Sequence, residues 1–164
     1  MTNGAYIEYQ NKGFWILEPF IEIISDFLCK TYESMEISKF NGNLMKIYHN
    51  CNANRTGVNI GMVNILLENY LVSQSDQATF VNILNQAKII ILSKGTEISI
   101  SALNQFENNK VYDDYKGNWI FPVKTQSLIS VLEILKELFA ETYPYTNRYV
   151  HFQGFPDIGA EDTL

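Results

Sequence analysis

The sequence has few basic residues and no long hydrophobic run, and each shortage excludes a class of protein. Twelve Lys and Arg residues against eighteen Asp and Glu residues give the 164-residue chain a net charge of −6 at pH 7. A protein that contacts many nucleic-acid phosphates needs a positive surface charge, so we expect no direct nucleic-acid binding. The longest apolar runs, residues 14–17 and 89–92, have four residues, whereas crossing a bilayer takes about 20. Residues 1–10 lack the basic and apolar regions of a secretory signal. We therefore expect a cytoplasmic protein that does not contact membranes.

The sequence also lacks the motifs of common active sites. Only two cysteines occur, and both fall on apolar helical patterns, so we expect Cys29 and Cys51 to be reduced thiols of the core. His49 precedes Cys51 by two positions, and side chains two apart on a helix point away from each other, so a shared metal is not expected. No glycine-flanked nucleophile and no phosphate-binding loop is present. The sequence thus predicts no catalytic residue, no cofactor, no metal and no enzymatic activity.

Apolar residues at helical spacing dominate the chain. In residues 19–32 they recur three and four positions apart, with charged residues between them, and Pro19 suits the first turn of a helix. Similar patterns predict further helices. They cover residues 38–51 with Ser38 as N-cap, 62–71, 73–95, a short segment carrying Leu103 and Phe106, and 127–141.

No repeat or proline-rich linker divides the chain, since its four prolines are scattered. The predicted fold is therefore all-α, a single domain over residues 1–164 built as a bundle of about five to six helices. A short strand or hairpin is allowed near residues 96–100, 119–123 or 148–155, and residues 156–164 are expected to form a loose tail. For residues 96–100 a helix capped by Ser99 or Ser101 is favoured over a strand.

A polar stretch at residues 108–118 is the predicted long exposed loop. Within it, Asp113 and Asp114 lie between Tyr112 and Tyr115. Two negative charges between two aromatic rings suit a surface that holds a basic partner. The alternative is a solvated loop whose tyrosines fold back on the core.

Arg55 follows a cluster of asparagines and precedes a Thr-Gly turn. A structural role is favoured over ligand binding, in which Arg55 satisfies helix-end carbonyls or an internal carboxylate.

The segment from Trp119 to Leu135 carries a resemblance to a known group. Its pattern is Trp119-x-x-Pro122-x-Lys124-Thr125-x-Ser127-Leu128-Ile129-x-Val131-Leu132-x-x-Leu135. Together with the acidic charge and the absence of enzyme motifs, this pattern resembles immunity proteins of bacterial contact-dependent growth inhibition and related polymorphic toxin systems. The likeness covers mainly residues 90–140. It implies that the chain binds the C-terminal domain of one cognate toxin, often a basic nuclease, and blocks its active site or its substrate surface.

For this function we expect the partner-binding residues to be Glu107, Tyr112, Asp113, Asp114 and Tyr115. The oligomeric state stays open. Two alternatives from other classes also stay open. One is an adaptor or structural subunit. The other is a small enzyme or ligand-binding protein with a pocket between helices, formed by His49, Cys51, Arg55 and His151.

Overall fold

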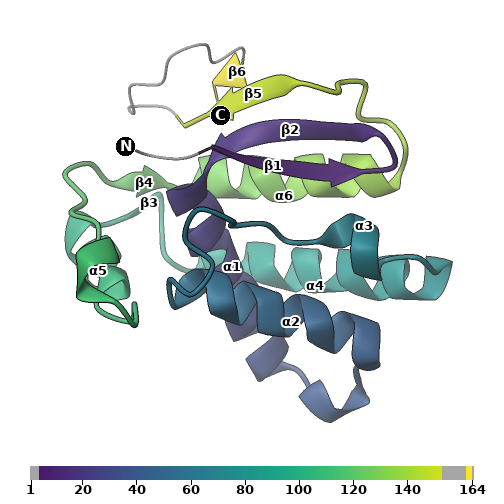
Figure 1. Ribbon diagram of the computed structural model, residues 1–164, viewed down its shortest axis with the longest axis horizontal. Coiled ribbons are helices and arrows are strands. Elements are labelled where there is room, and N and C mark those ends of the chain that lie inside the picture. The colour runs from purple at the N-terminus through teal and green to yellow at the C-terminus, as the bar shows by residue number, and fades with distance from the viewer. Residues whose placement is uncertain (1–3, 153–161, 164) are drawn as a thin grey trace.

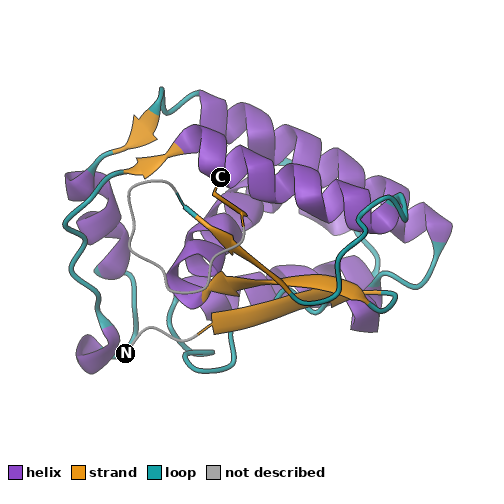
Figure 2. Cartoon of the chain, turned by 90° about the horizontal axis from the view of Figure 1, so that it is seen from above, coloured by secondary structure: helices purple, strands orange, loops and turns teal. Residues whose placement is uncertain are grey.

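A sheet and a group of helices form the two parts of the fold. The computed structural model describes residues 4–152 and 162–163. Figure 1 shows the sheet of β1, β2, β5 and β6 along the top of the view, with the main helices below it. Seen from above, the strands lie beside two long helices, and a separate two-stranded ribbon lies near one end of the molecule (Figure 2). The fold is therefore mixed α/β, and the expectation of an all-α bundle is wrong.

The N-terminal hairpin is the element that the sequence analysis missed. Strands β1 (Gly4–Tyr9) and β2 (Lys12–Leu17) pair antiparallel. Gln10 and Asn11 form the two-residue turn with φ values of 47° and 63°, the left-handed pair that fits the twist of a hairpin. Exposed or half-buried side chains alternate with buried ones along β1, which is the two-residue period of a half-buried strand. The turn lacks the usual glycine, and the apolar run in β2 hides the same period.

The C-terminal part of the chain completes the sheet. Strand β5 (Arg148–His151) runs parallel to β2, and β6 (Asp162–Thr163) runs parallel to β5. Strands β3 (Glu97–Ile98) and β4 (Val123–Lys124) form a small antiparallel pair. Short strands thus occur at all three places where the sequence allowed them. The expected loose tail at residues 156–164 lies outside the described residues, apart from β6.

Most of the predicted helices are confirmed. They are α1 (Glu18–Ser34), α2 (Gly42–Arg55), α4 (Gln74–Leu92), α5 (Ile100–Glu107) and α6 (Thr125–Phe139). The Ser73 and Ser99 side chains accept the N-cap bonds of α4 and α5. In α2 the cap is Asn41 rather than Ser38, because its Oδ1 accepts a bond from the backbone N–H of Leu44. Residues 37–39 form the short 3-10 helix η1 (Ile37–Lys39) instead.

The helix predicted over residues 62–71 is wrong except for its last turn, α3 (Leu67–Tyr70). The Glu18 carboxylate accepts bonds from the backbone N–H groups of Gly61 and Val63, which holds this part of the chain as an ordered non-helical segment. Leu66 then takes a positive φ of 61°. The helix can therefore begin only after it.

Helix α1 lies at the centre of the fold, where it packs against α2, α4 and the sheet. Its apolar face carries fully buried residues such as Tyr32, and its Phe20 ring stacks on Phe152 with the ring centroids 3.9 Å apart. The charged face of the helix is covered in part as well, because Glu22 and Asp26 are buried, whereas Lys30 and Glu33 are exposed. Within the described ranges, no helix combines the length and the hydropathy needed to cross a membrane.

Candidate functional site

Residues 112–115 form an exposed turn, here called the acidic turn. The 3-10 helix η2 (Asp113–Tyr115) occupies most of it. The Asp113 side chain is 89% exposed, and Tyr112 and Tyr115 are 54% and 51% exposed. Their rings meet edge to face, with the centroids 5.9 Å apart. The tyrosines therefore face solvent in part, and the alternative in which they fold back on the core is not what the chain adopts.

Lys116 fixes the charge and the shape of the acidic turn. Its Nζ atom lies 2.5 Å from Asp113 Oδ1, and its backbone N–H donates to the carbonyl oxygen of Asp113. The hydrogen bond from Lys116 and its positive charge lower the pKa of Asp113. Asp113 is therefore ionised at neutral pH.

Exposed apolar side chains surround this turn along the chain. Of the twelve large hydrophobic residues exposed in the described part of the molecule, six lie between residues 100 and 121. They are Ile100, Val111, Tyr112, Tyr115, Ile120 and Phe121. Scattered exposed apolar residues are normal on a soluble protein, but their concentration in one segment is typical of an interaction surface. This segment includes α5 and leads into β4, at one end of the molecule (Figure 1).

A buried ionic cluster lies under the acidic turn. Lys110 Nζ is 2.7 Å from Glu22 Oε2 of α1 and 2.8 Å from Glu107 Oε2 of α5. The Lys110 side chain is 5% exposed, and the two carboxylate side chains are each 3% exposed. We call these three residues the Lys110 cluster. It joins the central helix to the segment that carries the turn.

Glu107 was expected on the partner-binding surface, but the structure places it inside the protein. Its Oε2 atom accepts a bond from Gly117 N at 2.7 Å, and its Oε1 atom accepts one from Trp119 Nε1 at 2.8 Å. Both oxygens are thus occupied by groups of the same chain. Of the five expected surface residues, only the four of the acidic turn are exposed.

The Lys110 cluster has two carboxylates for one ammonium group. Burial raises the pKa of Glu22, and the charges of Glu107 and Glu18 raise it further, while Lys110 opposes both effects. Burial lowers the pKa of Lys110, but its bonds to Glu107 and Glu22 outweigh burial and leave that pKa raised. Lys110 is therefore the fixed positive charge on which the cluster depends.

A shallow polar depression lies between α5 and the chain that follows the acidic turn. Its lining includes Asn104, Asn108, Lys116 and Asn118. Asn104 uses its side-chain amide to hold both backbone groups of Trp119, at 2.8 Å and 3.1 Å. The depression is open and lined mainly by polar groups, whereas small-molecule sites are enclosed and mostly apolar. We assign it no ligand.

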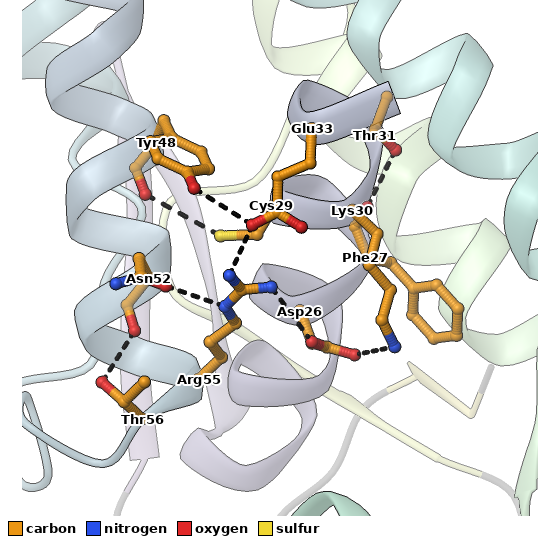
Figure 3. A network of polar contacts seen from close by, with 10 residues as sticks. All are labelled: Asp26, Phe27, Cys29, Lys30, Thr31, Glu33, Tyr48, Asn52, Arg55 and Thr56. Carbon is orange, nitrogen blue, oxygen red and sulfur yellow. Dashed lines mark hydrogen bonds and ion pairs between the residues drawn. The ribbon is translucent and has the colours of Figure 1, made fainter. Parts of the chain in front are cut away.

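A second polar network joins α1 to α2 (Figure 3). Arg55 Nη2 lies 2.6 Å from Glu33 Oε1, and Arg55 Nη1 lies 3.5 Å from Asp26 Oδ1. Arg55 Nε donates to Asn52 Oδ1 at 2.9 Å. The predicted structural role of Arg55 is confirmed: of its two expected forms, helix-end carbonyls or an internal carboxylate, Arg55 takes the second with Asp26. Its shorter bond goes to the exposed Glu33, and together these contacts join the two helices.

The alternative pocket of His49, Cys51, Arg55 and His151 does not form. His49 is exposed on α2, whereas Cys51 of the same helix is fully buried. His151 belongs to β5, on the other side of the molecule from α2 (Figure 1). Among the residues that the structure describes, no group of three or more His, Cys, Asp and Glu side chains is arranged to hold a metal.

The two free cysteines are expected to be unreactive in the folded protein. Both are buried, and burial raises the pKa of Cys29 and raises that of Cys51 to about 12. At pH 7 the thiolate fraction of Cys51 is then about 10⁻⁵. Labelling with a chromogenic disulfide should be at least about a thousandfold slower for the native chain than for the chain in guanidinium chloride. One rapidly labelled native thiol would contradict this and favour an enzyme.

The segment behind the family resemblance is mainly a core element. It runs from Trp119 through β4 into α6, and its apolar residues Leu128, Val131, Leu132 and Leu135 are buried. Core patterns of this kind are shared by unrelated proteins, so they carry little functional information. Comparison of the chain with known protein families, with curated proteins and with solved structures found no match in any of the three.

Proposed function

We propose that this chain is an immunity protein that binds the C-terminal domain of one cognate bacterial toxin, a basic nuclease, and blocks its active site or substrate surface. The observation that carries the proposal is the acidic turn, in which two exposed carboxylates lie between two half-exposed tyrosines. In this proposal the chain acts in the cytoplasm by binding alone, without catalysis or a cofactor.

Charge supports a basic partner. The chain has a net charge of −6, and a protein that handles nucleic acid presents basic residues to the phosphates. Opposite charges accelerate the encounter of two proteins and disfavour partners of the wrong sign. The carboxylates of the acidic turn would therefore act mainly on the rate and selectivity of association.

High affinity requires side chains that bury a large surface in the complex, which the carboxylates do not provide. Tyrosines are frequent hot spots of interfaces, because each buries a large ring while its hydroxyl still forms hydrogen bonds. Tyr112 and Tyr115 are half exposed and already packed against each other. A surface whose side chains are ordered before binding loses less entropy in the complex.

Two double variants separate the contribution of the carboxylates to the association rate from that of the tyrosines to the dissociation rate. The proposal places the toxin gene next to that of this chain, and the C-terminal domain of that toxin is the probe. The D113K/D114K variant should associate with it about tenfold more slowly than the wild type at low salt, and this difference should shrink at high salt. The Y112A/Y115A variant should instead dissociate at least about thirtyfold faster. Surface plasmon resonance at two ionic strengths measures both rates.

The matched control reverses two exposed carboxylates elsewhere. Glu137 and Glu141 lie at the C-terminal end of α6, which Figure 1 shows at the opposite end of the molecule from α5. The E137K/E141K variant has the same net charge as D113K/D114K, so it isolates local charge from total charge. Equal association rates for these two variants would remove the acidic turn from the interface.

A further inference from the structure

We infer that Lys110 is the positioning residue of the proposed surface: clamped between Glu22 and Glu107, it holds the acidic turn in the conformation that the partner meets. This inference rests on the proposed function, and it adds a residue that touches no partner. Its basis is that Lys110 is the point at which three separate parts of the chain are joined.

The first connection runs from the ammonium group to two helices. Lys110 Nζ contacts Glu22 of α1 and Glu107 of α5 at 2.7 Å and 2.8 Å. Glu22 belongs to the central helix, so the contact ties the start of the loop to a helix that is buried along most of its length. The same ammonium group donates to the carbonyl oxygen of Tyr115 at 3.5 Å, which reaches the acidic turn directly.

The second connection continues through Glu107 to the chain after the turn. The Glu107 carboxylate that Lys110 neutralises also accepts bonds from Gly117 N and Trp119 Nε1. Gly117 lies so close that a Cβ atom there would be 3.3 Å from the Glu107 carboxyl carbon. Lys110 precedes the acidic turn in the chain, and it also holds the far end of the turn, directly through Tyr115 and indirectly through Glu107 and Gly117.

The third connection uses the aliphatic stem of Lys110. Gly57 has a positive φ of 76°, and a Cβ atom there would lie 3.3 Å from Lys110 Cγ. The backbone N–H of the next residue, Val111, donates to the carbonyl oxygen of Thr56 at 2.9 Å. The chain at the end of α2 therefore contacts Lys110 and Val111, the two residues that precede the acidic turn.

Hydrogen exchange of the isolated protein tests the positioning role. In K110M, the backbone amides of Val111, Gly117 and Trp119 and the indole N–H of Trp119 should exchange at least about tenfold faster than in the wild type. A purely structural role would accelerate only amides that exchange through global unfolding, such as those in the middle of α1 and α4. The control K88M removes another lysine that is paired with a carboxylate, Glu133, and should leave these four groups unchanged.

A charge-balanced variant keeps the test valid if K110M unfolds. The variant K110M/E22Q/E107Q has no buried charge left in the cluster, so its core amides should exchange at nearly the wild-type rate. Its Val111 amide, which bonds to Thr56 and not to Glu107, should stay fast, because the bond from Lys110 to the turn is still missing. Wild-type exchange at Val111 in this variant would overturn the positioning role.

Binding of the adjacent-gene toxin domain is measured separately. The charge-balanced variant should dissociate from it about tenfold faster than the wild type, although it is fully folded. If the wild type itself does not bind this domain, the proposed function fails, whereas the exchange rates still decide whether Lys110 orders the turn. If loop exchange is fast but the dissociation rate is unchanged, the ordering of the acidic turn by Lys110 does not contribute to binding, and that part of the inference is overturned.

Discussion

Replacing Lys110 with methionine is expected to lower the free energy of unfolding by about 3–5 kcal/mol. The methionine side chain fills a similar volume, but it leaves the carboxylates of Glu22 and Glu107, each 3% exposed, without their positive partner. An unpaired charge in the interior costs far more than the ion pair contributes. Urea denaturation followed by far-ultraviolet circular dichroism measures the change. A loss below about 1 kcal/mol would contradict the expectation that an unpaired buried charge is left behind.

The charge-balanced variant K110M/E22Q/E107Q separates charge from packing. Because it removes all three charges, it should regain most of the stability that K110M loses.

The single variant E22Q tests how the stability depends on pH. The pKa of Glu22 is raised above its ordinary value of 4.5 in the folded chain, so the folded state binds this proton more tightly than the unfolded state does. The stability that this proton on Glu22 contributes is complete below pH 4.5 and is lost as the pH rises through the folded pKa of Glu22. E22Q should remove that pH dependence.

Replacing Gly13 with alanine is expected to cost about 3 kcal/mol, because the N-terminal hairpin has no room for a methyl group. A Cβ atom at Gly13 would lie 2.5 Å from the carbonyl oxygen of Ile7 and 2.8 Å from the Tyr6 ring. The first contact is with the backbone of the paired strand, so rotating a side chain cannot relieve it. Thermal and urea unfolding of G13A measure the loss.

Gly42 provides the matched control for Gly13. It begins α2, and a Cβ atom there would meet no other atom within 4 Å. G42A should therefore be neutral or stabilise the protein by up to about 1 kcal/mol, because alanine restricts the unfolded chain and favours a helix. If G13A were as stable as G42A, the register of the hairpin would be wrong.

Local patterns predicted the helices well where propensity, capping and packing agreed. Helices α1, α4 and α6 have regular apolar spacing, and α4 also has a serine cap. The hairpin was missed because its turn is Gln10-Asn11 rather than a glycine turn, and because the apolar run in β2 hides the two-residue period. The helix over residues 62–71 failed because Glu18, far away in the sequence, binds the backbone of that segment. A contact between distant residues overrides local preference and leaves no periodic signal.

The candidate site was predictable only in part, for the same reason. The polarity of residues 108–118 correctly indicated exposure of the acidic turn. Glu107 gave no sign of burial, because its partners Trp119 and Gly117 are ten or more positions away. The pairing of Lys110 with Glu22 joins a loop to a helix much earlier in the chain, with η1, α2, α3, α4, β3 and α5 between them. A polar position in an amphipathic pattern is consistent with solvent or with a buried ion pair, and only the tertiary fold decides between them.

The parallel pairing of β2 with β5 delays folding of the sheet during synthesis on the ribosome. Trp15 of β2 bonds to Asn147 across 132 positions of the chain, and the two strands are direct neighbours in the sheet. A ribosome must therefore release residues beyond 148 before the hairpin finds its partner strand, and closing so long a loop slows folding. Until then, one side of the hairpin presents unpaired backbone groups to other nascent chains.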